Sequence, residues 1–212
     1  MEPASDPLLI LMAVSLLVLP LAFIAWMGMR RPDRTRRAAE AAARALSLPE
    51  LPPLHRRMRI FAGRVMDLQV EVASEPQLAA VFEPVPIEHS LTQGLLVRAI
   101  FPQPLAVPFS IDSSRGAPAG FDPDEFGLVF PFKVISGNEA GFRHLMRGGE
   151  PAQAVNALFG GKAEGSGRIV RAESRGVFVF AQAMKPEDAA VLAHAVVKAA
   201  HLLAGGDIFG RR

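Results

Sequence analysis

Two histidines near the C-terminus are the side chains whose spacing best suits chemistry. His194 and His201 lie seven residues apart with Lys198 between them, so in a helix all three would share roughly one face. Such a face could carry an axial ligand for a porphyrin or a pair of metal ligands. However, two helical turns separate the rings by about 10 Å, too far for both to bind one ion. We therefore predict a solvated polar face opposite an apolar stripe.

An acidic patch, Asp122-Pro123-Asp124-Glu125, could supply oxygen ligands to a hard cation. No EF-hand spacing surrounds it, and Asp and Pro are typical turn residues, so we interpret the patch as a surface turn. The remaining histidines have no carboxylate or histidine at ligand spacing; they are His55, His89 and His144. We accordingly expect no metal site.

A glycine-rich stretch at residues 160–167 is the candidate for phosphate binding, and it fails on spacing. The first glycine and the magnesium-binding hydroxyl of a phosphate loop would fall at Asn156 and Ala163. A flexible connection explains the stretch better. No serine stands in a nucleophile elbow, and the chain has no cysteine. We predict no catalytic or cofactor-binding residues and a protein that is not an enzyme.

Chain length and net charge further limit the possible classes of protein and of partner. The chain has 212 residues, of which the first thirty or so form a hydrophobic N-terminal segment and its flank. The remaining residues are enough for one domain with a hydrophobic core. Its net charge is +2, and residues of both signs are spread through it, so we expect no nucleic-acid partner.

The first structural element along the chain is a hydrophobic segment near the N-terminus. Residues 8–29 contain no ionisable side chain, and a helix of that length matches a hydrocarbon core of roughly 30 Å. A buried core helix is the alternative, but the run has no polar stripe to face water. A cleaved signal peptide would need a positive start and a small-residue cleavage site, which are absent. We predict an uncleaved single-pass anchor after a tail at residues 1–7.

The flanks of this segment predict its orientation, because cytoplasmic flanks are enriched in Lys and Arg. Residues 1–7 hold no basic side chain, and Trp26 suits the membrane interface. Basic residues follow the segment at once: Arg30, Arg31, Arg34, Arg36 and Arg37. We expect the N-terminus outside and the following domain on the cytoplasmic side of the inner membrane.

Residues 30–53 form a basic, alanine-rich stretch that ends in prolines, which predicts a juxtamembrane helix and a stiff linker. Its arginines either contact anionic lipid headgroups or only enforce the orientation. A second basic cluster invites the same two interpretations, lipid contact or a solvated strand edge; it comprises His55, Arg56, Arg57, Arg59 and Arg64.

The soluble domain, expected at 54–206 before a tail at 207–212, reads as α+β. The domain is expected to begin with a hairpin that has Gly63 between its strands. In the strand at 66–72 apolar residues alternate with polar ones, so one face is expected to be exposed to solvent. Further segments follow. Strands are expected at 95–101, 105–111 and 127–135, helices at 139–146 and 151–159, a hairpin at 168–180, and a helix from Pro186 that ends at Gly205-Gly206. This order predicts a mainly antiparallel sheet packed with a C-terminal helix.

The favoured function is a non-enzymatic accessory or scaffold subunit of a larger bacterial membrane complex, whether energy-transducing (photosynthetic or respiratory), transport or secretion machinery. Small residues in the anchor would allow close packing against an integral membrane partner, in particular Ala22, Ala25 and Gly28. The alternatives are a membrane-tethered binding module for a lipid, peptide or small ligand, and an enzyme whose concave site gathers the acidic patch or the histidines.

Overall fold

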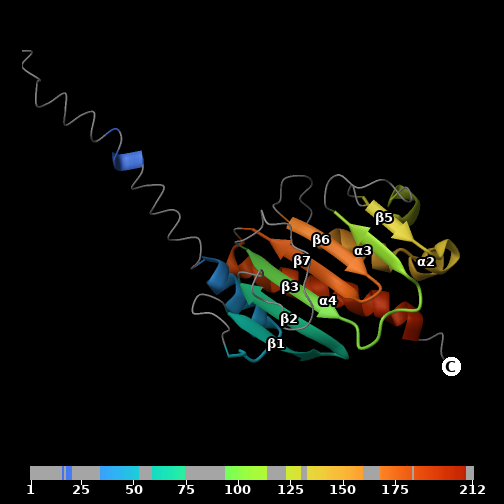
Figure 1. The fold of residues 1–212 in the computed structure, drawn as a ribbon, viewed down its shortest axis with the longest axis horizontal. Coiled ribbons are helices and arrows are strands. Elements are labelled where there is room, and N and C mark those ends of the chain that lie inside the picture. Colours follow the sequence, from blue (N-terminus) through green and yellow to red (C-terminus); the bar gives the residue numbers. More distant parts are fainter. Residues whose placement is uncertain are drawn as a thin grey trace, which may run out of the picture.

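A computed structural model describes residues 16, 18–20, 34–52, 59–74, 94–113, 123–129, 133–159, 168–182 and 184–208 (Figure 1). Its strands are β1 (Ile60–Val65), β2 (Leu68–Ser74), β3 (Leu95–Ile100), β4 (Phe109–Asp112), β5 (Lys133–Ser136), β6 (Arg168–Glu173) and β7 (Gly176–Ala181). Its helical elements are the 3-10 turn η2 (Pro123–Phe126), α2 (Glu139–Leu145), α3 (Glu150–Ala157) and α4 (Pro186–Ile208), preceded by a helix at residues 34–45.

The seven strands form one antiparallel sheet in the order β1-β2-β3-β7-β6-β4-β5. The predicted α+β class with a mainly antiparallel sheet is therefore confirmed. The β6–β7 hairpin lies where we expected it, and so do α2 and α3. α4 packs against β2, β3 and β7, and Figure 1 shows it crossing the far side of the sheet.

The first hairpin turns at a different place from the one predicted. Gly63 lies inside β1, paired with Val70, and the chain reverses at Met66 and Asp67. Met66 has a φ of +51°, a left-handed conformation that its side chain does not signal in the sequence. A Cβ on Gly63 would lie 3.2 Å from the Leu48 side chain. This glycine thus permits a close approach of the preceding segment rather than a turn.

Two other strands are shorter than predicted. The strand expected at 105–111 begins only at Phe109, after Pro108, and the one expected at 127–135 begins at Lys133. Proline lacks the N–H that a ladder requires, which explains the late start of β4. In the sheet, β4 is an interior strand that lies between β6 and β5, and β5 is an edge strand.

α4 carries the predicted two-sided pattern. Leu192, Val196 and Leu203 are buried against the domain, while the histidines and the lysine of the opposite face are exposed. The predicted end at Gly205-Gly206 is wrong, because the helix continues to Ile208. A glycine costs a helix only about 1 kcal/mol relative to alanine, so a terminal pair does not compel an end.

The helix at 34–45 is built into the same core as the sheet. Its alanine face is fully buried, comprising Ala38, Ala39, Ala42 and Ala43. The chain then runs beside β1, where the N–H of Leu51 donates to the carbonyl of Ile60 at 2.8 Å and Glu50 bridges Phe61. Residues 34–52, which we expected ahead of the domain, thus pack as part of it.

Most of the predicted anchor lies outside the described residues. Leu16 and residues 18–20 are described as helical, and their side chains are exposed, Leu16 by 74%. Within the described part of the chain, one helical stretch, Pro186–Gly205 in α4, is long and apolar enough to cross a membrane. Half of that stretch is buried inside the domain, where it serves as the core helix of the sheet.

Candidate functional site

A groove lies where the second half of α4 meets the connection between α2 and α3. Gly148 and Gly149 turn the chain between those helices, with φ angles of +89° and +77° that favour glycine. α2 is held in place at its start, where the Asn138 side chain accepts a hydrogen bond from the Gly141 N–H at 2.9 Å. Because α3 and α2 both pack on α4, this turn brings two distant segments together.

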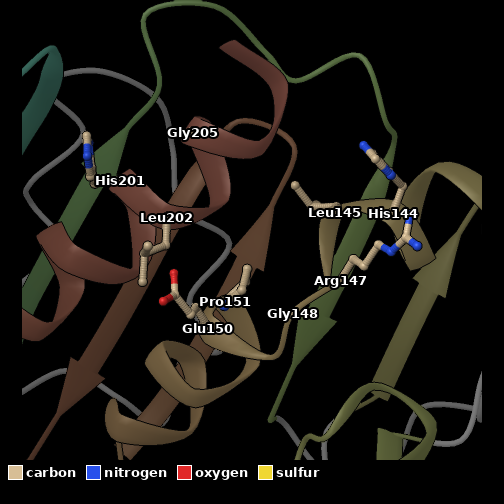
Figure 2. Close-up of a pocket in the computed structure, with 9 residues that line it drawn as sticks. All are labelled: His144, Leu145, Arg147, Gly148, Glu150, Pro151, His201, Leu202 and Gly205. Atoms are coloured by element: carbon tan, nitrogen blue, oxygen red, sulfur yellow. The ribbon is translucent and has the colours of Figure 1, made fainter. Parts of the chain in front are cut away.

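The groove has a volume of about 480 Å³. Its floor is apolar and comes from three segments, through Leu145, Pro151 and Leu202, while charged or titratable side chains stand around it. The polar members are His144, Arg147, Glu150 and His201. Figure 2 shows Leu202 beside Glu150 and Pro151, with His144 and Arg147 on the opposite side of the groove.

This mixture of an apolar floor and a polar rim suits an amphipathic ligand or a side chain of a partner. Within the described residues, no three histidine or carboxylate side chains gather at one point. Figure 2 places His201 and His144 at opposite ends of the groove. His201 is exposed on the predicted polar face of α4, and it also borders the groove.

A second cluster, which we did not predict, is a buried ion pair on the sheet face opposite the helices. Glu71 of β2 and Arg98 of β3 are directly paired in register, and both are fully buried. Nε of Arg98 donates to Oε2 of Glu71. The strand containing Glu71 was expected to have one wet face, and that expectation is wrong at Glu71, although Gln69 on the same side is exposed.

Burial dominates the electrostatics of this pair. Desolvation raises the pKa of the Glu71 carboxyl above its ordinary value, and the Arg98 guanidinium opposes that rise. Among the described residues, no donor reaches Oε1 of Glu71. The ion pair is thus held in a setting where neither charge is solvated by water.

The row of side chains continues across the sheet. Phe178 of β7 is the register partner of both Arg98 and Arg171, and Arg171 faces Asp112 of β4. Arg171 Nη2 lies 2.7 Å from Asp112 Oδ2. Each of these two arginines has a carboxylate partner on a neighbouring strand. The two ion pairs therefore link β2 to β3 and β6 to β4 within the sheet.

The acidic patch forms a surface turn, as predicted, as far as the structure describes it. Asp122 lies outside the described residues, whereas Glu125 is exposed in η2 and forms an ion pair with Arg143 at 3.0 Å. Hydrogen bonds with Glu139 and Glu125 raise the pKa of the Arg143 guanidinium above its ordinary value. Glu125 therefore links η2 to α2.

The glycine-rich stretch 160–167 lies outside the described residues, but Asn156 before it has a clear role. Its Nδ2 donates to the carbonyl of Gly127 at 2.8 Å, and its Oδ1 accepts from the N–H of Val129 at 3.1 Å. Asn156 thus fastens α3 to the segment after η2, a contact between residues far apart in sequence.

The predicted membrane-interface residues are only partly described. Arg34, Arg36 and Arg37 are exposed on the first helix, and Arg36 pairs with Glu40 at 3.1 Å. The other members lie outside the described residues: Trp26, Arg30, Arg31 and the small residues Ala22, Ala25 and Gly28. Comparisons of the chain with protein-family models, with curated proteins and with solved structures give no match.

Proposed function

We propose that the chain is a non-enzymatic accessory or scaffold subunit of a bacterial membrane complex. One N-terminal helix, residues 8–29, anchors it in the inner membrane, with the N-terminus outside and the domain on the cytoplasmic side. The partner is an integral membrane protein whose helices pack against the small residues of the anchor.

The observation that carries this proposal is the docking of the 34–45 helix into the domain core. Four of its six alanines, Ala38, Ala39, Ala42 and Ala43, are at most 1% exposed, so the helix is a fixed part of the domain. Arg34 is five residues beyond Met29, a distance of at most about 18 Å in an extended chain. A domain on so short a tether stays at the membrane surface, as a subunit that covers a partner must.

The position of the groove agrees with this role. In Figure 1 the 34–45 helix, drawn in blue, lies at the end of the domain where α4 begins, whereas the groove lies near the end of α4. α4 has 23 residues and therefore spans about 34 Å. The groove is thus presented at the end of the domain away from the tether.

The orientation is tested by labelling single cysteines, for which the chain offers a clean background because it has no cysteine. Ala4→Cys marks the N-terminal tail, and Val191→Cys marks an exposed position on α4. In intact cells stripped of the outer membrane, an impermeant maleimide should label Ala4→Cys and spare Val191→Cys until the membrane is opened. Labelling of Val191→Cys in closed cells would refute the cytoplasmic domain.

The subunit role is tested by purifying the native protein from its own membranes in mild detergent, with mass spectrometry and an absorption spectrum of what remains bound. We expect a defined complex with an integral membrane protein. A bare monomer that retains its anchor would contradict the role as a subunit while leaving the orientation untouched.

A membrane-tethered binding module is the second candidate, and the groove favours it. Leu202→Arg places a long charged side chain on the apolar floor and should reduce the retained partner or ligand by tenfold or more, as loss of a contact worth about 1.4 kcal/mol would do. Val191→Arg, on the exposed side of the same helix, is the matched control. Equal retention by both variants would exclude the groove as the contact.

A further inference from the structure

The first helix has a basic face opposite its alanine face. Arg37 and Arg44 are seven residues apart, two turns of helix, and both are exposed. The buried positions Thr35, Ala38 and Ala42 lie on the other side. Because the alanine face is fixed in the core, the side chains of Arg37 and Arg44 are directed away from the domain.

The charge of this face is unbalanced. The helix at 34–45 contains four arginines and one acidic residue, Glu40, which pairs with Arg36. Within the described part of the chain, no ion pair joins a carboxylate to Arg37 or Arg44. By contrast, Arg98, Arg143 and Arg171 each have a carboxylate partner.

We infer that Arg37 and Arg44 bind anionic phospholipid headgroups, so that the helix lies along the membrane surface and sets the orientation of the domain. This inference rests on the proposed anchor, which brings the helix within a few residues of the bilayer. Pro32 stands between the two segments in the sequence, and proline disfavours continuation of a helix, so the segments need not share one axis. A phosphate headgroup is the ligand that a guanidinium binds best in this setting.

The alternative occupant is an acidic surface of a partner protein, and membrane proximity favours the lipid. Each basic side chain close to an anionic membrane strengthens the contact by about fivefold. Arg37 and Arg44 are about 10 Å apart along the helix, so both can contact the surface only if the helix lies parallel to it.

The test uses the full chain in nanodiscs with a spin label at Ala41→Cys, a partly exposed position one turn from each arginine. In discs containing phosphatidylglycerol, the label should be protected from a water-soluble nickel complex, and in pure phosphatidylcholine it should be accessible. Arg37→Gln with Arg44→Gln should lower the equilibrium constant between the surface-bound and free orientations about 25-fold, from about fivefold per arginine. Arg175→Gln with Lys198→Gln removes the same charge from exposed positions outside both basic clusters and should leave the protection unchanged.

Three results would overturn the lipid contact: equal accessibility in both lipids, protection that the arginine pair does not affect, or protection that appears only with the native partner present. Failure of the anchor itself has a different signature, because the chain would then not enter the nanodisc at all.

Discussion

Arg98→Met is expected to lower the free energy of unfolding by about 3–5 kcal/mol, because it leaves the Glu71 carboxylate buried without its counterion. Both side chains are fully buried, on the interior strands β2 and β3 of the sheet, so neither charge is solvated by water. Chemical denaturation of the detergent-solubilised protein measures the change. Arg64→Met, on the exposed part of β1, is the matched control and should change stability by less than about 0.5 kcal/mol.

The double variant Glu71→Met with Arg98→Met separates loss of the partner from loss of the pair. Replacing both charges with apolar side chains removes the desolvation cost together with the attraction, so most of the stability should return. If the double variant were as unstable as Arg98→Met, the cost would come from packing and the electrostatic account would be wrong.

The same pair predicts a dependence on pH. The pKa of Glu71 is raised by burial, so the folded state holds this proton more tightly than the unfolded state. The stability from that difference is present below the ordinary pKa of the carboxyl and is lost as the pH rises through the folded-state pKa. Arg98→Met should steepen the loss, because the opposing guanidinium is gone, and Glu71→Gln should abolish this contribution.

Phe142→Ala is the second substitution with a large expected effect, a loss of about 3–5 kcal/mol. Phe142 is fully buried in α2, and its ring centroid lies 5.5 Å from that of Phe109 and 4.8 Å from that of Phe126. Removing the ring leaves a cavity where α2, β4 and η2 meet, which the rigid strand cannot close.

Thermal or chemical unfolding measures this loss, and Phe142→Leu is the graded control, with a smaller effect because part of the volume is retained. α2 also supplies Leu145 to the floor of the groove. A Phe142→Ala protein that remained as stable as the wild type would show that α2 is not fixed by this aromatic contact.

Local signals in the sequence predicted the elements whose pattern is complete within a short window. The β6–β7 hairpin alternates around Ser174 and Arg175, and α4 repeats its apolar residues with helical spacing. The predicted position of the first hairpin turn, at Gly63, was wrong because of a contact from another part of the chain. Gly63 permits the close approach of the Leu48 side chain, and no window around β1 contains that contact.

The candidate site could be predicted only in part. The polar face of α4 follows from its spacing, but His144 borders the same groove as His201 only because the α2–α3 turn packs on α4. Glu71 misled us for a similar reason. An acidic residue at an alternating position indicates water, unless a partner from another strand, here Arg98, neutralises it in register.

The pairing of β3 with β7 has a consequence for the order of synthesis. Leu95 pairs with Ala181, and α4, which follows both strands in the sequence, covers the strands that meet there. These contacts join segments far apart in the sequence, so the core cannot be completed until α4 has left the ribosome. The alanine face of the 34–45 helix emerges long before it has a surface to pack against. During that interval this apolar face is exposed, which makes the incomplete domain prone to aggregation.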